Sequence, residues 1–95
     1  MDFWTEQAAA SLNEEFGNQR GFEAFWSSSA VGMRLPGKGQ KVYILQLFRL
    51  GGGHELVLAS YTDANGLSKR TKFPNMDAGL EFLEAEARAH FSAME

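Results

Sequence analysis

Apolar residues along this chain recur at helical spacing near both ends and in extended runs between them. Residues 3–16 are rich in helix formers, with an apolar stripe at three- and four-residue intervals. They predict a helix that ends at Gly17 in the left-handed conformation. Asn75 is expected to cap a second helix, whose apolar stripe ends at residue 94. That stripe consists of Met76, Leu80, Leu83, Ala87, Phe91 and Met94, widened by Phe82.

The middle of the chain has the composition of strands separated by turns. Residues 21–33 combine aromatic residues with three serines, which favours one extended strand over a helix. Residues 34–41 contain a proline and two glycines and predict a loop. Residues 41–50 are apolar on both faces, which is typical of a central strand covered on each side. Residues 54–62 and 68–73 predict two further strands.

The turn between the last two strands is the tetrapeptide DANG at residues 63–66. Asp63 suits the cap of a type I turn and Gly66 the positive-φ position that follows. Pro74 ends the last strand because proline has no N–H for the ladder. The pattern predicts a single α+β domain over residues 1–95. Its architecture is a four-stranded antiparallel meander with an N-terminal and a C-terminal helix (α-β-β-β-β-α), one or both helices packing across a sheet face.

Composition narrows the class of protein. A chain of 95 residues with 44% hydrophobic content forms one compact core. The absence of cysteine excludes disulfides and thiolate metal sites, and it fits a reducing compartment. No apolar run approaches the roughly 20 residues of a membrane helix, and the N-terminus lacks a signal-peptide pattern. We therefore expect a cytoplasmic protein without a membrane partner.

The charges are unevenly distributed along the chain, whose net charge is −3. Residues 1–19 contain four acids and no base, and residues 74–95 contain five acids and one base. Residues 20–73 contain eight bases and three acids. If both helices cover one face of the sheet, the opposite face is expected to be positive.

Two sets of residues are candidate binding sites. The set for nucleic acid or an acidic partner is Lys38, Lys41, Arg49, Lys69, Arg70, Lys72 and Tyr61. The set for a basic partner is Glu14, Glu15, Glu81, Glu84 and Glu86. The charges also fit a protein without a ligand, in which lysines protect strand edges and acidic helices pair with basic strands. Side chains alternate along a strand, so residues 69, 71 and 73 should share one face, with residues 70 and 72 on the other.

No catalytic, metal or cofactor site is expected. The segment GMRLPGKG has the G-x-x-x-x-G-K spacing of a phosphate-binding loop, but Gly39 replaces the required hydroxyl and Pro36 interrupts the loop. His54 and His90 have no further ligands at metal-binding spacing. The serines at 27–29 have no activating neighbour. The sequence therefore predicts a protein that is not an enzyme.

The segments VYILQLFRL, ELVLASYTDANGLSKRTKF and MDAGLEFLEAEARAHF follow one another in the order found in a known family. Residues 41–92 thereby resemble a WGR domain, although Tyr61, Thr62 and Asp63 stand where the Trp-Gly-Arg triplet would fall. The resemblance implies a small sheet-and-helix module of the kind that contacts nucleic acid in poly(ADP-ribose) polymerases and bacterial relatives.

These observations leave two functions open. The first is a small non-catalytic protein that binds another protein, as an inhibitor, adaptor, immunity or phage anti-defence factor. Its net charge of −3 favours this function over general affinity for nucleic acid. The alternative is a small nucleic-acid-binding module that uses a basic antiparallel sheet. A homodimer is compatible with both, because an uncovered, partly apolar sheet face can pair with its copy.

Overall fold

The computed structural model describes residues 4–37, 41–49, 51–62 and 66–93, except for the side chain of Arg49. The elements in chain order are α1 (Trp4–Phe16), β1 (Glu23–Trp26), β2 (Ala30–Leu35), β3 (Lys41–Arg49), the short 3-10 helix η1 (Gly51–Gly53), β4 (Glu55–Thr62), β5 (Ser68–Phe73) and α2 (Met76–Ala93). The strands form one antiparallel sheet in the order β1-β2-β3-β4-β5. The α+β class, the meander and the two terminal helices are confirmed.

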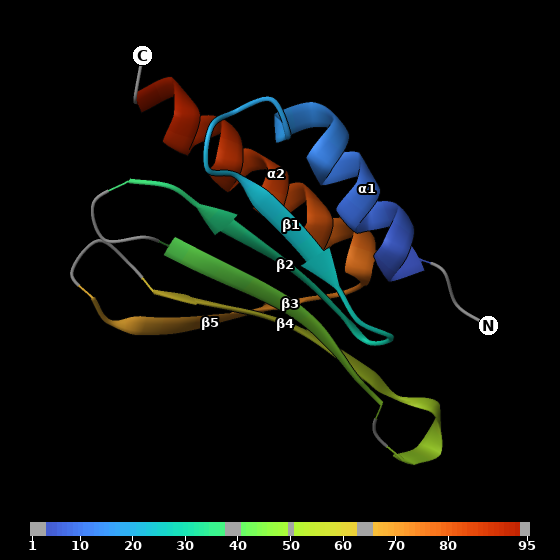
Figure 1. Cartoon of the computed structure of the whole chain (residues 1–95). Coiled ribbons are helices and arrows are strands. Elements are labelled where there is room, and N and C mark those ends of the chain that lie inside the picture. Colours follow the sequence, from blue (N-terminus) through green and yellow to red (C-terminus); the bar gives the residue numbers. More distant parts are fainter. Residues whose placement is uncertain (1–3, 38–40, 50, 63–65, 94–95) are drawn as a thin grey trace.

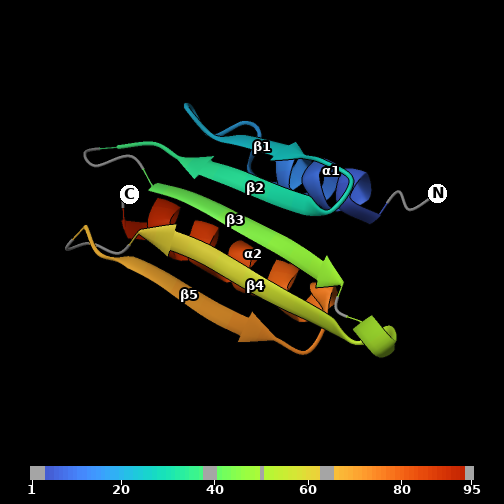
Figure 2. The same cartoon turned by 90° about the horizontal axis from the view of Figure 1, so that it is seen from below.

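Both helices lie on the same face of this sheet (Figure 1). Seen from below, the sheet lies in front, with α1 behind β1 and β2 and α2 behind the other strands (Figure 2). The domain therefore has two layers, and the described part of the chain places no element over the second face of the sheet. We call this second face the open face.

The predicted number of strands was wrong, because residues 21–33 form part of two strands instead of one. β1 ends at Trp26 and β2 begins at Ala30, and the Ser27 N–H donates to the Ala30 carbonyl at 2.8 Å to close the turn between them. Serine hydroxyls stabilise turns, so the serine run reverses the chain where an extended strand was expected. β2 then continues through Leu35, a fully buried residue that the sequence pattern assigned to a loop.

The core fills the space between the helices and the covered face of the sheet. Its largest fully buried side chains are Leu12, Met33, Leu35, Leu45, Leu83 and Val31. Aromatic rings form two clusters within the layer. Phe16, Phe22 and Phe91 contact one another in the first cluster, and Tyr43, Tyr61 and Phe82 in the second.

The helix ends are formed in two ways. Asn75 caps α2 as predicted, because its Oδ1 accepts a hydrogen bond from the Ala78 N–H at 2.8 Å. Gly17 does not take the predicted left-handed conformation. Its N–H continues the helical pattern by donating to the Asn13 carbonyl at 2.7 Å, and the first positive φ after α1 is found at Gly21. Gly66 has the predicted positive φ, whereas the expected cap at Asp63 lies outside the described residues.

The two helices run in the same direction and are joined near both ends. Near their N-terminal ends, the Trp4 indole N–H donates to the Asp77 carboxylate at 3.2 Å. Near their C-terminal ends, Arg88 lies 2.7 Å from Glu15 and 3.2 Å from Glu84. These carboxylates raise the pKa of Arg88, chiefly through the hydrogen bond to Glu15. The helix layer is thus held together by polar contacts at its rim as well as by the core.

Within the described ranges, neither helix is long and apolar enough to cross a membrane.

Candidate functional site

The open face carries a group of apolar side chains that neither helix covers. Cross-strand pairing places alternate residues of every strand on this face. Its apolar side chains are Phe25, Val42, Ile44, Phe48, Leu56 and Leu58. Val42 and Phe48 are the most exposed, at 37% and 39%, and the others are half-buried by their neighbours in the sheet.

Phe25 and Gly32 show how the open face is shaped. They are directly paired across β1 and β2, and the Phe25 ring lies over Gly32, where a Cβ atom would overlap it. An aromatic ring from the edge strand thereby shields the backbone of the neighbouring strand. This contact extends the apolar part of the open face from β3 toward β1.

The charged residues of the open face lie toward its two edges. At the β1 edge, Arg34 and Glu23 are paired across the strands, with a guanidinium–carboxylate distance of 3.2 Å. At the β5 edge, the exposed side chains of Arg70 and Lys72 lie on the open face because they pair with Ser60 and Leu58. The face is therefore mostly apolar in its centre, where Gln46 and Ser60 are polar members, and charged at its rims. Its described charged side chains are Arg34, Arg70 and Lys72 with Glu23.

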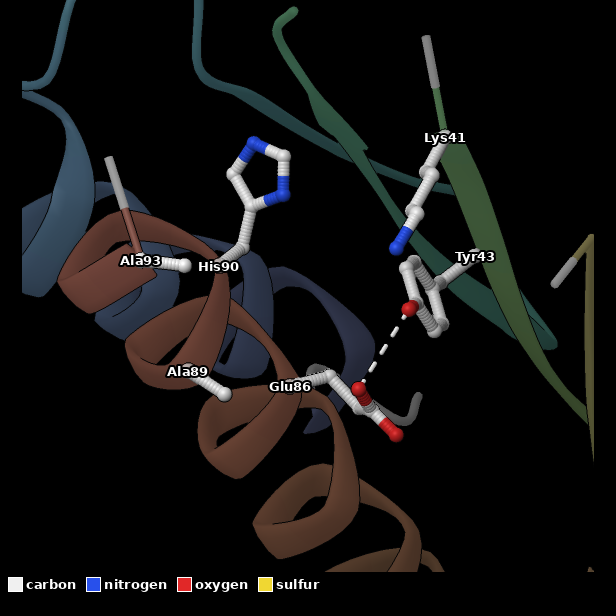
Figure 3. Close-up of a pocket in the computed structure, with 6 residues that line it drawn as sticks. All are labelled: Lys41, Tyr43, Glu86, Ala89, His90 and Ala93. Carbon is white, nitrogen blue, oxygen red and sulfur yellow. Dashed lines mark hydrogen bonds between the residues drawn. The ribbon is translucent and has the colours of Figure 1, made fainter. Parts of the chain in front are cut away.

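A small hollow lies on the other side of the sheet, between the first residues of β3 and the last turns of α2. It has a volume of about 280 Å³ and is lined by Lys41, Tyr43, Glu86, Ala89, His90 and Ala93 (Figure 3). The Tyr43 hydroxyl donates to the Glu86 carboxylate at 3.4 Å. Burial and, second, the charge of Glu86 raise the pKa of Tyr43 to about 12. Tyr43 is therefore a protonated donor near neutral pH and is unsuited to act as a base.

His90, at the end of this hollow, has a structural partner. Its Nε2 atom lies 2.6 Å from the Pro36 carbonyl oxygen. Because a carbonyl oxygen only accepts, Nε2 must carry the proton. The contact ties the last turn of α2 to the end of β2. The hollow thus combines a tyrosine bonded to Glu86, a histidine bonded to the backbone and one lysine, and we assign it no reaction.

A second hollow lies beside the β4–β5 hairpin and has a volume of about 240 Å³. It is lined by Val42, Ser60, Tyr61, Thr62, Ser68, Lys69 and Arg70. Hydroxyl groups and two cations make this hollow suitable for an oxyanion. It opens mainly onto the open face, since Ser60, Thr62 and Arg70 belong to that face.

The structure divides the predicted basic set between the two faces. Arg70 and Lys72 lie on the open face, whereas Lys41 and Lys69 belong by register to the face that bears the helices. Arg49 pairs with Glu55 in the ladder, although its side chain is not described. Lys38 lies outside the described residues. The alternation predicted for residues 69–73 is confirmed.

Tyr61 was predicted as a binding residue but takes part in an aromatic cluster. Its ring stacks on Tyr43 with centroids 5.2 Å apart and also contacts Phe82. The half-buried ring packs against α2 and also lines the second hollow, so its role in binding stays a prediction.

The predicted acidic set is also divided. Glu15 and Glu84 bind Arg88, and Glu86 accepts the hydrogen bond from Tyr43. Glu14 and Glu81 are exposed on the helices. Most of these acids therefore have a role within the fold. Across the described ranges, no three histidine or carboxylate side chains lie close enough together to hold a metal ion.

The apolar residues of the open face were not among the predicted site residues. The signal for them is present in residues 41–50, which are apolar on both faces. That pattern was interpreted as a strand covered on each side, but the helices cover only one side of β3. The second apolar side of β3 is surface, and it is the main clue to a binding site.

Comparisons of the chain with protein-family models, with curated proteins and with solved structures gave no match. The resemblance to WGR domains therefore stays a prediction.

Proposed function

We propose that this protein is a small non-catalytic binding protein that recognises another protein through the open face of its sheet. The observation that carries the proposal is the apolar centre of that face, which is left uncovered by both helices. Apolar patches bordered by charged residues are typical of protein–protein interfaces. An inhibitor, adaptor, immunity or anti-defence role fits such a surface, and a cytoplasmic location fits the lack of cysteine.

Aromatic and aliphatic side chains in the centre of the face would supply most of the binding energy. Phe25 and Phe48 come from different strands, and Ile44 lies between them on β3. Such central side chains act as hot spots when a partner excludes water from them. The rim residues Arg34, Arg70 and Lys72 would then select the partner by charge.

The proposal is tested by affinity capture from cells of the source organism, with and without nuclease. Leu58→Glu places a carboxylate in the centre of the open face, and Ala10→Glu introduces the same charge at an exposed position on α1. A protein partner should be retained by the wild type and by Ala10→Glu, survive nuclease, and be lost with Leu58→Glu. Circular dichroism establishes that both variants are folded, and titration of the purified partner then gives its Kd.

Retention of the same proteins by Leu58→Glu would contradict the assignment of binding to the open face.

A second candidate function is nucleic-acid binding, which the hollow at the β4–β5 hairpin favours. Arg70, Lys69 and nearby hydroxyls border that hollow and are suited to phosphate. This function predicts an affinity for oligonucleotides that falls steeply with salt. Reversing the charges of Lys69, Arg70 and Lys72 should abolish oligonucleotide binding. If the affinity and its dependence on salt were unchanged, nucleic-acid binding through this hairpin would be contradicted.

A further inference from the structure

The open face has a charge pattern that suits one partner in particular. We propose that its occupant is a second copy of this chain, packed face to face about a two-fold axis that runs along β3. This inference rests on the proposed function, because it names the protein that the open face binds.

The register of the sheet defines which side chains would meet. One row across the open face contains Phe25, Gly32, Ile44, Ser60 and Arg70. Rotation by 180° about β3 leaves β3 opposite β3 and exchanges β1 with β5. Ile44 then faces its own copy, and Arg70 of each copy faces Phe25 of the other.

This pairing is favourable at both positions. Two Ile44 side chains bury each other at the centre, where water is best excluded. A guanidinium over an aromatic ring forms a cation–π contact. In the neighbouring row, Leu58 faces Ala30 of the other copy, so a large side chain meets a small one.

The positions of the charged side chains favour a two-fold axis along β3 over a two-fold axis that runs across the strands. With the axis across the strands, β5 would face β5, and the Arg70 and Lys72 side chains of both copies would meet. With the axis along β3, these cations lie over β1, the strand that carries Glu23. Like charges are then separated: by register Arg70 faces Phe25 of the other copy, and Glu23, already paired with Arg34 of its own chain, lies one row away.

The face approaches the area that a dimer interface buries. Five strands at about 4.8 Å spacing, and about six residues at 3.3 Å each, give a flat area of roughly 500 Å². Side chains protrude from the sheet, so the accessible area exceeds this flat area and approaches the roughly 800 Å² that each partner buries in a standard interface. Two sheets packed in this way form a sandwich with one helix layer on each outer side.

The first test measures the mass of the purified full chain by sedimentation and light scattering over a roughly hundredfold range of concentration. We expect twice the chain mass of 10.5 kDa for the wild type and for the Ala10→Glu control. Ile44→Glu should be monomeric, with a dimer Kd raised at least about a hundredfold, because it sets two carboxylates opposite each other on the axis.

The second test establishes the axis, and it is simple because the chain has no cysteine. Facing sheets lie about 10 Å apart, so a short bis-maleimide should link Ile44→Cys into a covalent dimer. Lys72→Cys should not be linked by the same reagent, because the two β5 strands lie about 20 Å apart laterally. Ala10→Cys on α1 is the control for random collisions.

Three results would overturn the proposal: a wild type that is monomeric throughout the range, a dimer that survives Ile44→Glu, or a reagent that links Lys72→Cys but not Ile44→Cys. A monomeric wild type that still captures a foreign protein, and loses it with Leu58→Glu, would overturn the second copy and keep the proposed function. A wild type that is monomeric and captures no protein partner would overturn both the dimer and the proposed function.

Discussion

Gly79 determines how closely α2 approaches the sheet. The side chain of Leu45 lies against this glycine, and a Cβ atom at position 79 would overlap it. Leu45 is fully buried between β3 and the helix, so its side chain would have to repack within the core to admit a Cβ atom. The close contact explains why a helix-weakening residue stands in the first turns of α2.

Replacing Gly79 by alanine should destabilise the protein despite alanine's better helix propensity. Overpacking costs about 1–3 kcal/mol and the propensity gain is about 1 kcal/mol, so we expect a net loss near 1 kcal/mol. Denaturant unfolding measures the change. Ala85→Gly, at an exposed position of α2, is the matched control that measures propensity alone. Stabilisation by Gly79→Ala would contradict the steric argument.

Ionisation of Tyr43 should lower the free energy of unfolding at alkaline pH. Its pKa is about 12 in the folded state and 10.0 as the unperturbed value, mainly because it is buried. A raised pKa means that the folded state holds the proton more tightly, so the contribution is complete below pH 10 and is lost as the pH rises toward 12.

Two pH units correspond to about 3 kcal/mol, and solvent screening of the partly buried hydroxyl makes the expected loss smaller than this. Unfolding free energies of the wild type and Tyr43→Phe across this pH range measure it, with tyrosinate absorbance recording the ionisation. The variant should show a shallower decline. Equal slopes would show that Tyr43 does not carry this pH dependence.

At the scale of elements, β3 has two apolar faces with different roles. Leu45 points into the core and is fully buried, whereas its neighbour Ile44 lies on the open face and is half-buried. Truncation in a core leaves a cavity, while truncation on a surface does not.

Leu45→Ala should therefore cost about 2–5 kcal/mol and Ile44→Ala only about 1 kcal/mol, when both are measured at low protein concentration. Chemical denaturation of the two variants gives this comparison directly. Equal large losses would mean that the open face is covered within a single chain.

The start of α2 depends on one side chain, since Asn75 accepts the hydrogen bond from the Ala78 N–H. Asn75→Ala should cost about 1 kcal/mol, and Asn75→Asp should restore most of it because aspartate also caps helices. Thermal or denaturant unfolding measures both. An unchanged stability in Asn75→Ala would show that the cap contributes nothing.

At the scale of the whole molecule, the arrangement of both helices on one face creates the binding surface. Placing one helix on each side would have buried Ile44 and Leu58 as well as Leu45. The open face follows from the packing of α1 against β1 and β2 and of α2 mainly against β3, β4 and β5 on the same side of the sheet (Figure 2).

A dimer through this face predicts that the apparent Tm rises with protein concentration, because association stabilises the folded state. The rise should be present in the wild type and absent in Ile44→Glu, as measured by scanning calorimetry. A Tm independent of concentration in both would contradict the dimer.

The amino-acid sequence determined the class of this fold and most of its elements, because these depend on local periodicity. Asn75 as a cap, the stripe of α2 and the alternation along β5 could all be recognised from neighbouring residues. The turn at Ser27–Ser29 was missed because three serines are compatible with both a strand and a turn, and pairing between β1 and β2 decides between them.

The tertiary structure alone decided which face of the sheet is exposed. Two-sided apolarity in β3 has the same pattern whether the second side faces another layer or solvent. The tertiary structure also decided where the charges lie. Alternation along β5 divides the predicted basic residues between two faces, and the ion pairs of Arg88 engage two of the predicted acidic residues. Local periodicity shows which residues share a face, but only long-range packing settles what covers that face.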